Sequence, residues 1–167
     1  MIVAAGQGKR LLPLTEKCPK ALVKIGNRPL FSFSLACMIR AGIRDIGIVI
    51  QPQFRDEFEK TIQEEKFDAH ITLIDQPEAL GMAYAVLTAR EFVKNRVCLV
   101  LAGDSVNNFD FTQALTRFES GANIFARREP DPTIQRASGV VEIDDTGKVI
   151  KITEKPDMPA SDLLQIA

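Results

Sequence analysis

The chain has 167 residues, of which 46% are hydrophobic and 26% are charged, and its formal net charge is −1. This length suits one domain with a sizeable core, and the near-neutral charge argues against a general nucleic-acid binder. No apolar run reaches membrane-spanning length and no basic region precedes an apolar stretch at the N-terminus, so we predict a cytoplasmic protein without a membrane partner. Three cysteines without paired spacing and one histidine indicate neither a disulfide framework nor a zinc site.

Apolar patterns predict strands that alternate with helices over the first two thirds of the chain. Short apolar runs predict strands at residues 1–5, 46–50, 70–74 and 97–102. Helical spacing of apolar residues predicts helices at residues 28–42, 54–65, 81–94 and 110–121. This alternation indicates an α/β, Rossmann-like, doubly wound fold, with a mostly parallel sheet, helices on both faces and ligands at the carboxyl ends of the strands.

The last third of the chain has a different pattern. Short apolar runs predict strands at residues 123–127, 139–143 and 148–152. The sequence DDTG between the last two indicates a C-terminal β-hairpin. Residues 127–138 are predicted to form a loop.

The segment AAGQGKRLLPLTEKCPKAL, residues 4–22, contains a glycine-rich loop that matches neither common phosphate-binding pattern. A dinucleotide fingerprint needs a glycine where Leu11 stands, and a Walker loop needs glycine–lysine before serine or threonine. Gly6 and Gly8 still allow backbone N–H groups to approach an anion. Lys9 and Arg10 follow them directly, and Lys20 stands later in the segment. Such a loop can wrap a polyphosphate.

This segment resembles the signature of the sugar-1-phosphate nucleotidylyltransferases, or NDP-sugar pyrophosphorylases, with Lys9 where threonine or serine is commoner. The glucose-1-phosphate thymidylyl- and uridylyltransferase branch is the most similar. Four further segments are similar to later parts of the family pattern, in the same order: 26–43, 76–86, 100–105 and 147–161. The resemblance therefore covers nearly the whole chain, with a nucleotide-binding part at 1–126 and the start of a sugar-phosphate part at 127–167 of a single domain.

The resemblance implies a role for each matched residue. The residues expected at the nucleotide are Ala5, Gly6, Gly8, Lys9, Gln76 and Gly81. Arg10 would hold the departing β- and γ-phosphates, and Lys20 would neutralise charge on the α-phosphate. Gln76 offers an amide donor and acceptor that can pair with the edge of a pyrimidine. The resemblance favours UTP or dTTP, because a glutamine at this position is commonest in the branches that use uridine and thymidine nucleotides.

Asp104 lies just after an apolar strand, where the resemblance implies an Mg²⁺ ligand. The sugar and its phosphate would meet Gly139, Glu154 and Lys155. Plainer interpretations exist for all these residues: a solvated surface cation, a strand-end turn, a capping aspartate or a charged hairpin edge.

The implied reaction transfers NMP from an NTP to a sugar 1-phosphate. The acceptor phosphate is largely dianionic at neutral pH, so no general base is needed. The alternatives are a non-catalytic nucleotide- or sugar-nucleotide-binding relative or subunit, and a phosphocholine cytidylyltransferase. The family pattern continues beyond SDLLQIA (161–167) to a second metal-binding aspartate. We therefore expect a C-terminally truncated fragment or a naturally short relative of the family. This interpretation leaves open whether the chain is catalytically active by itself, and it is compatible with a homo-oligomer.

Overall fold

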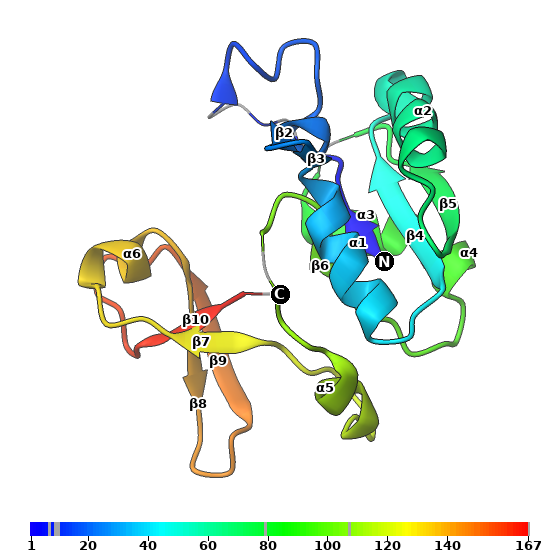
Figure 1. Ribbon diagram of the computed structural model, residues 1–167. Helices are drawn as coiled ribbons and strands as arrows, with labels where there is room; N and C mark the ends of the chain where they lie inside the picture. The colour runs from blue at the N-terminus through cyan, green and yellow to red at the C-terminus, as the bar shows by residue number, and fades with distance from the viewer. Residues whose placement is uncertain (7, 9–10, 79, 107, 167) are drawn as a thin grey trace. The chain divides into compact units, whose positions relative to one another are not determined.

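The chain divides into two units, Met1–Arg117 and Phe118–Ala167. Four parallel strands form the sheet of the first unit. The computed structural model describes residues 1–6, 8, 11–78, 80–106 and 108–166. The first sheet has the order β5–β4–β1–β6 (Figure 1). Its strands are β1 (Ile2–Val3), β4 (Asp45–Ile50), β5 (His70–Asp75) and β6 (Leu101–Ala102). This order places the first strand inside the sheet, between β4 and β6.

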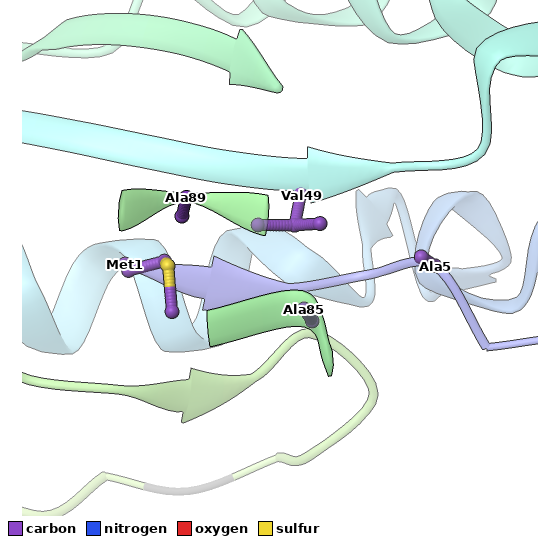
Figure 2. Close-up of a cluster of buried hydrophobic side chains, with 5 residues drawn as sticks. All are labelled: Met1, Ala5, Val49, Ala85 and Ala89. Atoms are coloured by element: carbon purple, nitrogen blue, oxygen red, sulfur yellow. The ribbon is translucent and has the colours of Figure 1, made fainter. Parts of the chain in front are cut away.

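Helices cover both faces of this sheet (Figure 1). They are α1 (Phe31–Arg40), α2 (Arg55–Glu65), α3 (Met82–Thr88) and α4 (Arg90–Val93). On one face, the aromatic rings of Phe31 in α1 and Phe58 in α2 have centroids 5.6 Å apart. On the other, Val49 packs with Ala85 of α3 and with Ala89, which lies between α3 and α4 (Figure 2). The predicted α/β fold with a mostly parallel sheet is confirmed.

Strand β4 shows why its sequence is apolar at consecutive positions. Its residues alternate between the two covered faces, and Ile46 to Ile50 are all buried. At Gly47, an added Cβ would lie 2.9 Å from the ring of Phe92 in α4. A side chain larger than hydrogen does not fit there, so the glycine lets α4 approach the strand closely.

Several predicted elements are shorter in the structure. Helix α1 begins at Phe31 rather than near residue 28, because β3 (Arg28–Pro29) pairs with β2 (Lys24–Ile25). The helix predicted at 81–94 is divided into α3 and α4 at Ala89. The strand predicted at 97–102 pairs only at Leu101 and Ala102. The last helix of the unit is α5 (Thr112–Thr116), and short 3₁₀ turns occupy η2 (Lys20–Leu22) and η3 (Pro52–Phe54).

The second unit is an antiparallel sheet of order β7–β10–β8–β9. Its strands are β7 (Ala126–Arg128), β8 (Gly139–Ile143), β9 (Val149–Glu154) and β10 (Leu163–Gln165). The predicted hairpin is confirmed between β8 and β9, and its turn is held by Asp144. This carboxylate accepts hydrogen bonds from the backbone and hydroxyl of Thr146 and from the backbone of Lys148, which lower its pKa.

Two features of this unit differ from the sequence prediction. Residues 127–138 are not one loop: they contain part of β7 and the helix α6 (Pro132–Arg136), whose first turn is capped by the Asp131 side chain accepting from Thr133 N. Strand β10 was not predicted, and it lies between β7 and β8. In the described part of the chain, no helix has both the length and the apolar character to cross a membrane.

Candidate active site

A cavity of about 480 Å³ lies in the first unit, and residues at or just beyond the carboxyl ends of β1, β5 and β6 line it. Its lining includes residues from four segments that are far apart in the sequence. Those predicted from sequence to bind nucleotide or metal are Ala5, Gly6, Gly8, Lys20, Gln76, Gly81 and Asp104. Lys9 and Arg10, also predicted for this site, lie outside the described residues. The remaining lining residues are mainly apolar, among them Val3, Leu11 and Met82.

Lys20 and Asp104 form an ion pair at the wall of this cavity. The Lys20 Nζ atom lies 2.6 Å from Asp104 Oδ2, although the two residues are 84 positions apart. Their side chains are 34% and 43% exposed. An ion pair this open to water contributes little to stability, so its two partners are available to a charged ligand.

The strand end that carries Asp104 is held tightly. Gly103 N donates a hydrogen bond to Val3 O (2.8 Å), and Ser34 Oγ donates one to Ala102 O (2.7 Å). A Cβ added to Gly103 would lie 3.1 Å from Ala4 Cβ, Ile2 Cγ2 and Val3 O. Only glycine fits this contact without displacement of β1. The sequence analysis did not assign Gly103 a role, although a glycine between an apolar strand and an acid was visible in VLAGDS.

The glycine loop is fixed at two points. Gln51, which follows β4, donates from Nε2 to Ala5 O at 2.9 Å. Gly8 has φ +62°, a conformation that side-chain-bearing residues rarely adopt. Its carbonyl accepts hydrogen bonds from Leu11 N (2.9 Å) and from Thr15 Oγ1 (2.8 Å). Gly6 is less crowded than Gly8, because a Cβ added to Gly6 would meet no atom within 4 Å. Gln51 and Thr15 were missed as supports of the loop.

Gln76 is a buried amide with one unused acceptor. Its side chain, directly after β5, belongs to a residue that is 2% exposed. Nε2 donates to Glu78 O at 2.7 Å, whereas Oε1 accepts no hydrogen bond from any described residue. A buried acceptor without a partner is unfavourable, and a ligand N–H in the cavity would remove that cost. Nearby, Arg55 pairs with Asp75 at 2.9 Å; this carboxylate raises the pKa of the guanidinium.

The residues predicted to contact the sugar phosphate lie together in the second unit. Gly139 and Glu154 are directly opposite each other in the β8–β9 pair. A Cβ on Gly139 would lie 3.2 Å from Glu154 Oε2. Lys155 follows β9 with φ +48°, places its Nζ 3.1 Å from Glu154 Oε1, and donates its backbone N–H to Ser138 O.

The site contains a limited set of metal ligands. Among the described residues, no group of three or more His, Cys, Asp or Glu side chains is placed to hold a metal ion. Asp104 is the one carboxylate in the described lining of the cavity. This donor set fits Mg²⁺, which commonly keeps waters and takes only one or two carboxylates, with the other ligands supplied by substrate phosphates.

Together, the parallel sheet, the glycine loop and the cavity at the carboxyl edge define an α/β protein with a ligand cavity where open parallel sheets place their binding sites. The chain belongs to the nucleotidyl transferase family, whose family model matches residues 1–167. This confirms the family predicted from the sequence.

Curated relatives are similar over almost all of this chain. The glucose-1-phosphate thymidylyltransferase of Neisseria gonorrhoeae is 33% identical over 167 residues, which is 97% of this chain and 57% of the relative. That of Xanthomonas campestris pv. campestris is 35% identical, over 96% of this chain and 55% of the relative. A low-salt glycan biosynthesis nucleotidyltransferase of Haloferax volcanii is 30% identical, over 99% of this chain and 47% of the relative. The chain spans about half the length of the curated relatives it matches.

Solved structures agree on the fold. A Bacillus anthracis structure described as a glucose-1-phosphate thymidylyltransferase in complex with a sucrose has a TM-score of 0.88 and 27% identity, over 99% of this chain and 67% of that one. A UDP-glucose pyrophosphorylase complexed with UDP-glucose has a TM-score of 0.84, over 99% of this chain and 72% of that one. Its sequence identity is 20%, so this likeness supports the fold alone.

Proposed function

We propose that this chain carries the nucleotide-binding site of an enzyme that transfers NMP from an NTP to a sugar 1-phosphate and releases pyrophosphate. The observation that supports this most strongly is the convergence of the glycine loop, the Lys20–Asp104 pair and Gln76 on one cavity. The relatives named glucose-1-phosphate thymidylyltransferase support the same reaction. A glucose-like sugar 1-phosphate is therefore the acceptor we propose.

The buried amide of Gln76 supports a uracil or thymine base. Nε2 already donates to Glu78 O, whereas the buried acceptor Oε1 has no partner among the described residues. The N3–H of uracil or thymine is a donor that can satisfy it. Gly81, with φ +91° and no atom within 4 Å of an added Cβ, leaves room for the base to lie against the backbone. UTP and dTTP are the proposed donors.

The phosphates are assigned to the glycine loop and the cations. Backbone N–H groups at Gly6 and Gly8 would approach the triphosphate closely. We propose, on the basis of the sequence pattern, that Arg10 holds the β- and γ-phosphates and that Lys9 also contacts the nucleotide. Lys20 would leave Asp104 and neutralise the charge that builds up on the α-phosphate, since its half-exposed ion pair is readily exchanged.

Asp104 is the proposed ligand of Mg²⁺, together with phosphate oxygens and waters. When bound, the ion supplies positive charge that offsets the repulsion between two polyanionic substrates. The ammonium of Lys20, released from Asp104, would add a second positive charge on the side of the α-phosphate.

The chemical step needs no protein nucleophile. An oxygen of the sugar 1-phosphate attacks the α-phosphorus in line, the bond from that phosphorus to the bridging oxygen breaks, and pyrophosphate leaves. No proton moves in this step, because the attacking phosphate is already largely dianionic at neutral pH. Catalysis therefore consists of positioning and charge stabilisation. In the second unit, Lys155 and Glu154 are the proposed contacts for the sugar phosphate and hydroxyls, and Gly139 leaves space beside them.

The test measures nucleotide binding and pyrophosphate release by this chain, with UTP or dTTP, glucose 1-phosphate and Mg²⁺. Lys20→Met and Asp104→Asn should each lower turnover by about 100-fold, in the range of losses seen when one transition-state contact is removed. Lys24→Met is the matched control, because Lys24 is an exposed lysine in β2 outside the cavity lining. Its turnover should equal that of the wild type. Binding without turnover would contradict the enzymatic role and support the non-catalytic alternative.

A further inference from the structure

Thr15 is a buried residue in an otherwise exposed segment. The segment between Leu11 and Cys18 places large apolar side chains in water, with Leu12 56% and Leu14 59% exposed. Thr15 is only 7% exposed. A polar side chain that turns inward while its apolar neighbours face solvent needs a specific partner.

That partner is the backbone of the glycine loop. Thr15 Oγ1 donates a 2.8 Å hydrogen bond to Gly8 O, across seven positions in the sequence. The Gly8 carbonyl oxygen also accepts a hydrogen bond from Leu11 N at 2.9 Å. Two donors therefore hold one carbonyl, and they fix the orientation of the Gly8 C=O group.

The methyl group of Thr15 has a separate packing role. A Cβ added to Gly8 would lie 2.9 Å from Thr15 Cγ2 and 3.2 Å from Lys20 Cβ. Thr15 and the stem of Lys20 therefore both lie close against Gly8. Gly8 and Lys20 line the main cavity, whereas Thr15 lines a separate, smaller cavity of about 270 Å³. Thr15 therefore contacts Gly8 of the glycine loop without itself lining the main cavity.

We propose that Thr15 is a positioning residue for triphosphate binding, acting through its hydrogen bond to the Gly8 carbonyl. This inference rests on the proposed function, because it assigns the glycine loop to the phosphates. It predicts that loss of the Thr15 hydroxyl weakens contacts to the phosphates and leaves contacts to the base, made at Gln76, unchanged.

The experiment compares Thr15→Val with Thr15→Ser. Valine keeps the shape and the methyl contacts of threonine but cannot donate to Gly8 O, whereas serine can. Affinities for dTTP and UTP are measured by calorimetry, and those for thymidine and uridine by NMR titration. Thr15→Val should weaken triphosphate binding about tenfold, as expected for one lost hydrogen bond, and nucleoside binding less than twofold. Thr15→Ser should restore triphosphate affinity to within about threefold of wild type.

Thr61→Val is the matched control. Thr61 Oγ1 donates to Glu57 O at 2.7 Å within α2, so this variant removes an equivalent hydroxyl-to-carbonyl bond outside the cavity lining. It should leave both affinities unchanged. Unchanged triphosphate binding in Thr15→Val would overturn the inference, and so would equal losses for triphosphate and nucleoside, which indicate general loosening.

A ligand-free measurement separates this inference from the proposed function. Exchange of the Leu11 amide, which is bonded to Gly8 O, should be at least about fivefold faster in Thr15→Val than in wild type or Thr15→Ser. An unchanged rate would show that Thr15 does not hold the loop. Failure of the wild-type chain to bind either triphosphate would overturn the proposed function, and with it the assignment of Thr15 to triphosphate binding.

Discussion

The two units place their candidate site residues in different ways. In the first unit, the cavity is lined by segments that meet only because parallel strands align their carboxyl ends: Lys20 and Asp104 lie 2.6 Å apart but are 84 positions apart in sequence. In the second unit, Glu154 and Lys155 are adjacent in sequence, and Gly139 is the antiparallel partner of Glu154 in one hairpin. The first site depends on the packing of the whole sheet, whereas the second depends mainly on the register of two strands.

This difference suggests unequal sensitivity to small changes in packing. The Cβ of Gly103→Ala would meet Ala4 Cβ, Ile2 Cγ2 and Val3 O at 3.1 Å, and two of these belong to the buried strand β1. We expect a loss of about 1–3 kcal/mol in unfolding free energy, typical of overpacking. The Cβ of Gly139→Ala would meet chiefly the end of the exposed Glu154 side chain, 3.2 Å away, which can turn aside.

Hydrogen exchange during urea unfolding can measure each unit separately. Amides of β1 and β4 report on the first unit, and amides of β8 and β9 report on the second. Gly139→Ala should change stability by less than about 0.5 kcal/mol. Equal losses in the two variants would remove the distinction between packing-dependent and register-dependent sites.

Gln76 tests whether a site residue in the first unit is kept for folding or for a ligand. Gln76→Leu replaces a buried amide with an unused acceptor by an apolar side chain of similar size. We expect unchanged or slightly higher stability, since no unpaired acceptor remains, and about tenfold weaker binding of dTTP or UTP. Calorimetric titration and thermal unfolding measure the two effects. A large loss of stability would mean that Gln76 serves the core rather than the base.

The smallest expected effect is at the opposite end of the same sheet. Asp45 begins β4 and accepts a 2.6 Å hydrogen bond from Arg96 Nη1, with His70 Nδ1 3.5 Å from its other oxygen. Chiefly the Arg96 contact lowers the pKa of this carboxyl below its ordinary value. Asp45 therefore binds a proton less readily in the folded state than in the unfolded state. Its contribution to folding stability is complete above a pH of about 4 and is lost as the pH falls through the lowered pKa.

Because Asp45 is exposed, this contribution should be below about 1 kcal/mol. Asp45→Asn should reduce stability at pH 7 by that small amount and should flatten the acid dependence of unfolding between about pH 5 and pH 2. Urea titrations at each pH measure it, and nucleotide affinity at pH 7 should not change. A shift in nucleotide affinity would show that the two ends of the sheet are coupled.

The elements with strong periodicity were predicted well from sequence. Strand β4 and helix α2 are long, regular and apolar on the covered faces, so their hydrophobic patterns indicated both type and position. Strand β10 could not be predicted, because three residues acquire strand structure only through pairing with β7 and β8. For the same reason, Arg28 and Pro29 were predicted as helix but form strand β3, because their pairing with β2 outweighs the local preference for helix.

The candidate site shows the same division. The sequence by itself determined which residue types were present: two loop glycines, cations, an amide after β5 and a carboxylate after β6, all in a family order. Only the tertiary structure decided that Lys20 contacts Asp104, that Gln76 keeps an unused acceptor, and that Thr15 holds Gly8. Periodicity and turn preferences act between neighbours in sequence, whereas these contacts arise between distant segments that only the folded sheet brings together.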